Sequence, residues 1–201
     1  MKRLLMAILL GLLALPALGR EYQSGFGFSL EASDDWLVLT PKELKDNPEL
    51  FNVDKLKGGS IDPALLEQVV GMVRSGQVEV YLHQKTSDAR FADNVNFLTQ
   101  VGRLPTAASE VKGVCDVLPG ELSQAFGRPI RMYQCGARQV GKAAALQAEF
   151  DGMIEGTRSI QYQFQKSPSV VVIATATAKL DALETIRAEF ERMIASVRVA
   201  P

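Results

Sequence analysis

The sequence has few of the side chains that carry most enzyme chemistry. Its 201 residues include one histidine, His83, one tryptophan, Trp36, and two cysteines. A Ser–His–Asp triad would have to use His83, and no Gly-x-Ser-x-Gly sequence is present to supply the nucleophile. The cysteines and the single histidine do not have the spacing of a zinc site. We therefore expect no catalytic residue, no metal and no cofactor.

The chain also lacks an excess of positive charge. It contains 22 lysines and arginines against 23 aspartates and glutamates, and the two signs are mixed along the sequence. Without Lys2 and Arg3, the net charge is −3. Nucleic acids and anionic lipids require a basic surface, so neither is an expected partner.

One long apolar run is present, at the N-terminus. Lys2 and Arg3 precede an uncharged stretch from Leu4 to Leu18, which is shorter than the roughly 20 residues of a membrane span. Small residues precede the bond between Gly19 and Arg20, as at a signal-peptidase site. We predict a signal peptide over residues 1–19, cleaved after Gly19, and a periplasmic or secreted protein without stable membrane insertion. The alternative is an uncleaved N-terminal anchor. A lipoprotein is not expected, because no cysteine stands at the predicted cleavage point.

The two cysteines, Cys115 and Cys135, lie in the predicted exported part of the chain. An even number of cysteines in an oxidising compartment favours a disulfide. The alternative is a pair of separate buried thiols.

The mature chain, residues 20–201, alternates strand and helix patterns typical of one α+β domain. The clearest unit runs from Arg158 to Val199: an alternating strand, a β-branched strand, a helix after Asp181 and a short closing strand. Pro119-Gly120 predicts a break in the helical segment from Leu104 to Phe126. The other expected strands are 26–30, 36–39, 77–85, 95–101, 130–138 and 142–151; the other helices are a turn after Pro41 and a helix after Asp62.

Two parts of this pattern are candidates for function. The polar stretch 42–61 is either an ordered functional excursion or a mobile loop. On the strand 77–85, alternation places Tyr81 and His83 together with Glu79 on the more polar face. We interpret His83 as a solvated or hydrogen-bonded surface residue rather than a catalytic one. We expect the Trp36 side chain to close one edge of the hydrophobic core. The alternative is that its ring forms a surface on which a ligand stacks.

Three short phrases resemble the PsbP-like superfamily, which includes photosystem II PsbP and bacterial DcrB-type secreted proteins. They are Gly27-Phe28-Ser29-Leu30 with Asp35-Trp36, then Phe91 to Asn96, and Phe190 to Val197. The superfamily usually has proline before the tryptophan, where Asp35 stands, and phenylalanine where Val197 stands. The resemblance implies a single-domain antiparallel sheet flanked by helices, an α/β/α sandwich. It also implies an accessory or binding module rather than an enzyme, and it transfers no functional residue.

The leading hypothesis is an exported, non-enzymatic accessory or binding protein whose partner is a periplasmic protein or a small ligand. One alternative is an inhibitor or immunity-type protein that uses residues 42–61. The other is a hydrolase that uses the Tyr81–His83 face. The sequence does not indicate the oligomeric state.

Overall fold

The computed structural model describes residues 19–48, 63–88, 91–140 and 143–199. The predicted signal peptide and most of the polar stretch 42–61 lie outside these ranges. None of the helices in the described part is long and apolar enough to cross a membrane.

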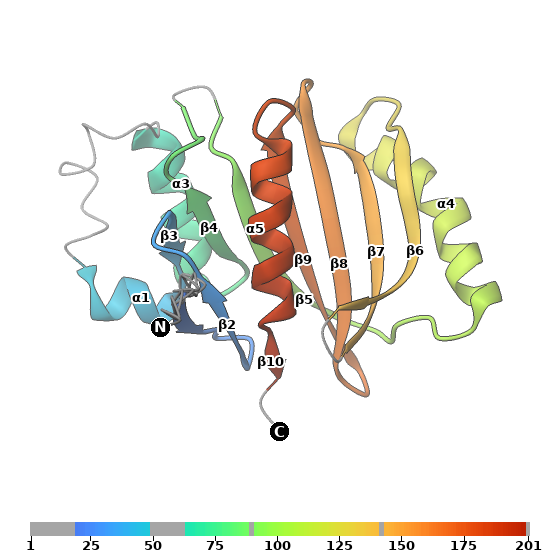
Figure 1. The fold of residues 1–201 in the computed structure, drawn as a ribbon, viewed down its shortest axis with the longest axis horizontal. Coiled ribbons are helices and arrows are strands. Elements are labelled where there is room, and N and C mark those ends of the chain that lie inside the picture. Colours follow the sequence, from blue (N-terminus) through green and yellow to red (C-terminus); the bar gives the residue numbers. More distant parts are fainter. Residues whose placement is uncertain (1–18, 49–62, 89–90, 141–142, 200–201) are drawn as a thin grey trace, which may run out of the picture.

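A seven-stranded antiparallel sheet forms the centre of the molecule, and its strand order is β3-β4-β5-β9-β8-β7-β6 (Figure 1). Strands β6 to β9 follow one another in the chain and pair consecutively over long stretches as a meander, and β5 pairs with β9. The members are β3 (Trp36–Leu39), β4 (Glu79–His83), β5 (Asn94–Val101), β6 (Met132–Val140), β7 (Ala143–Asp151), β8 (Thr157–Ser167) and β9 (Val170–Lys179).

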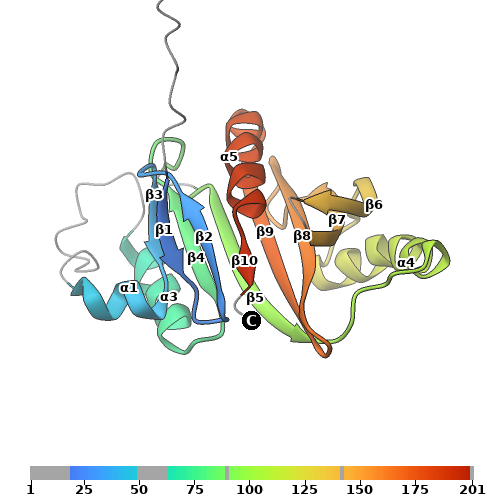
Figure 2. The same ribbon diagram turned by 60° about the horizontal axis from the view of Figure 1, so that its bottom comes forward.

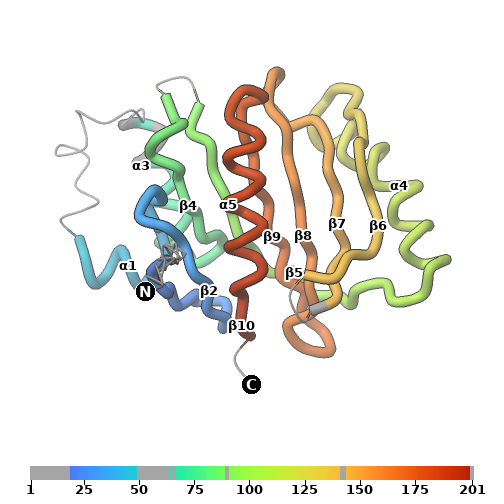
Figure 3. The backbone as a smooth tube through the Cα atoms, in the orientation of Figure 1, coloured from blue at the N-terminus to red at the C-terminus, as the bar shows by residue number. Residues whose placement is uncertain are grey.

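A second, three-stranded sheet was not expected from the sequence. It consists of β1 (Arg20–Gln23), β2 (Phe28–Ala32) and β10 (Arg198–Val199), with β2 in the middle. Figure 3 shows β2 and β10, from opposite ends of the described chain, side by side. Local patterns do not reveal such a pairing, because it depends on contacts across almost the whole sequence.

Helices cover both faces of the large sheet, which confirms the expected sandwich. Helix α5 (Leu183–Ala195) and the small sheet lie on one face, and α1 (Pro41–Asp46), α3 (Pro63–Arg74) and α4 (Ala108–Phe126) lie on the other (Figure 2). The main core forms under α5, where the expected apolar stripe of that helix is buried. Val69, Val70 and Val73 of α3 pack against the β3–β4 end of the opposite face.

The predicted break at Pro119 is wrong, because α4 continues through it. Leu118 and Leu122 on the two sides of the proline pack in one cluster against Phe150 of the sheet. This packing compensates for the hydrogen bond that a proline inside a helix cannot make. The helix ends before Gly127, whose φ of 67° suits glycine at a C-terminal cap.

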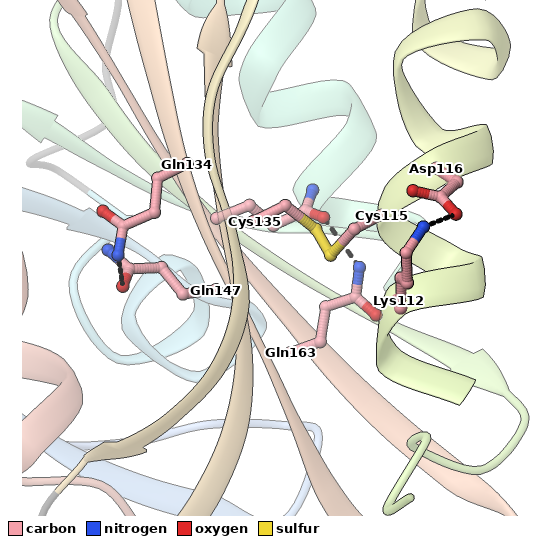
Figure 4. Close-up of a disulfide and its surroundings, with 8 residues drawn as sticks. Lys112, Cys115, Asp116, Gln134, Cys135, Gln147 and Gln163 are labelled. Atoms are coloured by element: carbon pink, nitrogen blue, oxygen red, sulfur yellow. Dashed lines mark hydrogen bonds and ion pairs between the residues drawn. A yellow bond between two sulfur atoms is a disulfide. The ribbon is translucent and has the colours of Figure 1, made fainter. Parts of the chain in front are cut away.

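The expected disulfide between Cys115 and Cys135 is confirmed. It joins the middle of α4 to β6, with 5.6 Å between the two Cα atoms (Figure 4). No residue of α4 is fully buried, so the covalent bond supplements a modest packing interface.

Candidate functional site

The face of the large sheet opposite α5 is covered at its two ends, by α3 and by α4. Beside α4 lies a cleft of about 400 Å³, lined by this helix, the sheet and adjoining loops. The cleft opens above the middle strands β5, β9 and β8. It is larger than the cavity of about 200 Å³ at the end of α5.

The floor of the cleft consists of two rows of uncharged polar side chains. In each row one residue from β5, one from β9 and one from β8 are direct neighbours across the sheet. The first row is Asn96, Thr175 and Gln161, and the second is Asn94, Thr177 and Ser159. Successive residues of one face stand two positions apart along each strand, so the two rows form a regular array of amides and hydroxyls.

Hydrogen bonds within the floor orient these groups. The Gln161 amide donates to the Thr175 hydroxyl at 3.1 Å, and the Ser159 and Thr177 hydroxyls are 2.9 Å apart. The Gln163 amide in turn donates to Gln161 Oε1 at 2.8 Å. Each group keeps further donor or acceptor capacity, because a hydroxyl offers two lone pairs and a carboxamide four hydrogen-bonding positions. The floor is thus ordered before any ligand arrives.

The walls of the cleft are apolar. Leu122 and Phe126 of α4 form one side together with Phe150, and Phe91 contributes from the loop before β5. Met153 and Ile154 stand at the rim, where 64% and 49% of their surfaces are exposed. Isolated exposed apolar residues are common, but these two border a polar floor and extend its apolar wall.

Among the described residues, no lysine, arginine, histidine, aspartate or glutamate lines this cleft. An ionic ligand would lose hydration there without gaining a counter-charge, which is costly. The arrangement suits a neutral ligand that presents hydroxyl, carbonyl or amide groups to the sheet and an apolar surface to α4.

The sequence contained a signal for this cleft, although the interpretation did not use it. On β9 the face toward α4 changes from Val171 and Ile173 to Thr175 and Thr177. A β-branched run such as 170–175 is typical of a strand buried on both faces, and this holds only where α4 covers the strand. The change to threonine marks the point on β9 beyond which α4 no longer covers the strand.

A smaller cavity of about 200 Å³ lies at the C-terminal end of α5. Phe164, Ile194 and Val197 make its lining mainly apolar. The one amide that reaches it, Gln165, already bonds the backbone of Leu104, Gly102 and Val170. This cavity therefore offers a ligand no free polar group from Gln165, and it is the weaker candidate.

The predicted exposed face at Tyr81 and His83 is wrong. Tyr81 is 0% exposed and His83 1% exposed, and β4 is buried on both faces. The Tyr81 ring packs against Tyr22 of β1 and Phe97 of β5. The small sheet, which alternation along a single strand cannot reveal, covers this side of β4.

Glu79, the third member of that face, is also buried and has a structural contact. Its Oε1 accepts a 2.6 Å hydrogen bond from the Gly25 amide in the β1–β2 turn. Burial raises the pKa of Glu79, and hydrogen bonds from Ser24 and Gly25 oppose this rise. Burial, and then the charge of Glu79, raises the pKa of the Tyr81 hydroxyl well above its usual value.

His83 occupies a polar pocket of the core beside Trp36. The two rings make an edge contact with centroids 4.8 Å apart, and the Trp36 indole donates to Glu189 of α5 at 2.6 Å. Trp36 is 3% exposed, so its predicted role as a core plug is confirmed. Tyr81, His83 and Glu79 line neither cavity, so the hydrolase hypothesis has no accessible site at these residues.

Comparison with known proteins identifies the fold. No protein-family model matches the sequence, and no curated protein matches it. The solution structure of cyanobacterial PsbP (CyanoP) from Synechocystis sp. PCC 6803 does match, with a TM-score of 0.54 and 11% identity. The match covers 92% of this chain and 95% of that one.

Two other structures match with a TM-score of 0.47 and 13% identity. One is a protein from Bacteroides thetaiotaomicron, for which the match covers 91% of this chain and 49% of that chain, so this chain spans about half its length. The other is LpqN, involved in cell envelope biogenesis of Mycobacterium tuberculosis, with 91% and 86% covered. The resemblance expected from the sequence phrases is therefore confirmed at the level of structure: this chain has the PsbP-like fold.

Proposed function

We propose that this chain is an exported, non-enzymatic binding protein that holds a small neutral ligand in the cleft beside α4. The ligand presents hydroxyl, carbonyl or amide groups to the sheet and an apolar surface to α4. The observation that carries the proposal is the double row of amides and hydroxyls across β5, β9 and β8.

The size and lining of the cleft support this function. Small-molecule sites commonly have volumes of about 300–1,000 Å³, with apolar walls and a few placed polar groups. The cleft has about 400 Å³ and this composition. A well-made neutral hydrogen bond contributes about 1 kcal/mol net, so several of them select a ligand without binding it irreversibly.

The chemistry of the floor supports binding rather than catalysis. Activation of a serine or threonine hydroxyl requires a base within hydrogen-bond reach. The Ser159 and Thr177 hydroxyls bond to each other, and the Thr175 hydroxyl accepts from the Gln161 amide. No ionisable side chain of the described residues shares the lining with them.

Export is supported by two features. Disulfides persist mainly in oxidising compartments, and Cys115 and Cys135 form one. Cleavage after Gly19 would also leave the small sheet intact, because β1 begins at Arg20.

Calorimetric titration of the mature chain with three probes tests the proposal. The probes are a neutral disaccharide, a dipeptide blocked at both ends, and a sugar phosphate. We expect at least one neutral probe to bind, and the sugar phosphate to bind at least about tenfold more weakly because of its uncompensated charge. The stronger of the two neutral probes identifies the ligand chemistry.

Two matched variants locate the binding. Ile154→Glu places a charge at the rim of the cleft, whereas Leu180→Glu changes a similarly exposed apolar residue elsewhere, since 49% and 55% of these side chains are exposed. We expect Ile154→Glu alone to weaken binding. Equal affinities in both variants, or no binding of either neutral probe at about 10 mM, would overturn the proposal.

A further inference from the structure

Three potential metal ligands from distant parts of the chain meet beside Trp36. They are Asp35 before β3, His83 at the end of β4, and Glu189 on α5. One ligand atom from each lies within 4.8 Å of the other two. The group is separate from the cleft, because none of the three residues lines it.

His83 presents an unpartnered nitrogen to this group. The side chain is 1% exposed, and Nε2 has no hydrogen-bond partner among the described residues. The nearest carboxylate oxygen is Glu189 Oε1, at 3.6 Å. A buried polar atom without a partner is uncommon in proteins, and a bound cation is one group that satisfies a ring nitrogen.

The other imidazole nitrogen is held in place. The Thr86 amide donates to His83 Nδ1 at 3.3 Å, and the Thr86 hydroxyl oxygen lies 2.7 Å from the same nitrogen. A metal bound at Nε2 requires the proton on Nδ1, where it donates to the Thr86 hydroxyl in place of the longer bond from the amide. Nε2 then carries a free lone pair, and metal-binding histidines characteristically donate their other N–H to an oxygen in this way.

The carboxylate of Glu189 is held in a similar way. Its Oε2 accepts from the Trp36 indole at 2.6 Å and from the Ser33 hydroxyl at 3.1 Å. These donors fix the carboxylate and leave Oε1 toward His83. Asp35 is held less firmly, through Oδ2, by the exposed amine of Lys85 at 2.8 Å.

We propose that Asp35, His83 and Glu189 bind a first-row divalent cation of the zinc type. One imidazole and two carboxylates suit Zn²⁺ and its neighbours, whereas Ca²⁺ takes oxygen ligands only. Tetrahedral bonds of about 2.1 Å place ligand atoms about 3.4 Å apart. His83 Nε2 and Glu189 Oε1, at 3.6 Å, already stand near this separation. The remaining contraction, up to about 1.4 Å from the 4.8 Å limit of the cluster, falls on Asp35, whose side chain is 28% exposed and can rotate.

Such an ion would join three segments that are far apart in the sequence. It would link α5 to the β3–β4 end of the sheet, under the small sheet formed from the two chain ends. Three protein ligands leave one tetrahedral position open toward the Asp35 side, where the side chain is 28% exposed. The ion stabilises the folded chain, because the unfolded chain does not assemble these ligands.

The only tryptophan of the chain reports on the site. Co²⁺ is titrated into the tag-free mature protein after chelator treatment, and the emission of Trp36 is recorded. We expect Co²⁺ to quench this emission and Zn²⁺ to restore it by displacement, because Zn²⁺ binds more tightly to such ligands than Co²⁺ does in most sites. Zn²⁺ should also raise the thermal midpoint.

Single-residue variants separate this site from adventitious binding. Asp35→Asn changes a partly exposed ligand with little risk to folding, and Asp34→Asn changes the exposed neighbour outside the cluster. We expect Asp35→Asn and Glu189→Gln to weaken Zn²⁺ binding at least about tenfold and Asp34→Asn to leave it unchanged. Absence of quenching at about 1 mM Co²⁺ would overturn the proposal, as would equal quenching in Asp35→Asn and Asp34→Asn.

Discussion

Gln161 of β8 and Thr175 of β9 face each other across the sheet, and the Gln161 amide donates to the Thr175 hydroxyl at 3.1 Å. The pair stands in the centre of the cleft floor, with Asn96 as the next neighbour on β5. The bond leaves one amide hydrogen of Gln161 and the lone pairs of Asn96 for a ligand. The proposed binding function depends most directly on this pair.

Thr175→Val should reduce binding of a neutral ligand without unfolding the sheet. Valine keeps the β-branched shape and removes only the hydroxyl. Because the lost hydrogen bond borders an open cleft, the free energy of unfolding should change by no more than about 1 kcal/mol. Affinity for the neutral probe should fall several-fold, measured by calorimetry. Thr99→Val, an exposed position of β5, is the control and should leave affinity unchanged.

Replacement of Cys115 and Cys135 by serine should destabilise the chain. A disulfide that closes a loop of 20 residues stabilises by about 3 kcal/mol in the chain-entropy model. The loss is measured by urea unfolding of the oxidised protein and the double variant. Amide hydrogens of α4 should exchange faster in the variant, because no residue of this helix is fully buried. A loss much below about 1 kcal/mol, with unchanged exchange in α4, would contradict this account.

Glu79→Gln should stabilise the protein at neutral pH relative to the wild type. Burial raises the pKa of Glu79, so folding favours its protonated form. The stability that this group contributes is complete below its unfolded pKa of about 4.3 and is lost as the pH rises through the higher folded value. Glutamine stays neutral and can still accept from Gly25. The stability difference, measured by unfolding from pH 4 to 8, should therefore grow with pH, and a constant difference would refute the prediction.

Glu149 should show the opposite pH dependence. Burial alone would raise its pKa, but hydrogen bonds from Arg187 and Arg158 outweigh burial and lower it. Arg187 of α5 bonds both carboxylate oxygens at 3.0 Å, which ties the helix to β7. The stabilisation is present above the unfolded pKa of about 4.3 and is lost as the pH falls through the lower folded value.

Glu149→Gln tests this interaction by urea unfolding at pH 7 and at pH 3. We expect a loss of about 3 kcal/mol at pH 7, because two partly buried arginines lose their charge partner, and a smaller loss at pH 3. Glu184→Gln removes a weaker partner of Arg187 whose side chain is 82% exposed, and it should cost well under 1 kcal/mol at either pH. Equal costs for the two substitutions would show that burial of the Glu149 pair is unimportant.

The sequence predicts the parts of the fold that depend on local patterns. The strands over Arg158–Lys166 and Val170–Thr175 and the helix after Asp181 are all present, because alternation and apolar stripes are visible within one element. The small sheet was missed because β1 is short and its neighbour β2 pairs with residues at the other end of the chain.

The errors at the candidate sites have the same origin. Tyr81 and His83 were placed on a polar surface because nothing within β4 indicates that β1 and β2 cover it. The threonines and amides of the cleft lie on three separate strands, and only the pairing of these strands beside α4 makes them the floor of a cleft. The polar cluster at His83 likewise joins residues 35, 83 and 189, which no sequence window contains.

The most direct test of the binding site is the side-chain amide signal of Gln161 in NMR spectra of the mature protein during titration with the neutral probe that binds more tightly. The account predicts saturable shifts of this signal and of the backbone amides of Thr175 and Thr177, with the signals of the smaller cavity at Phe164 and Ile194 unmoved. Saturable shifts at Phe164 and Ile194 with an unmoved Gln161 signal would contradict it.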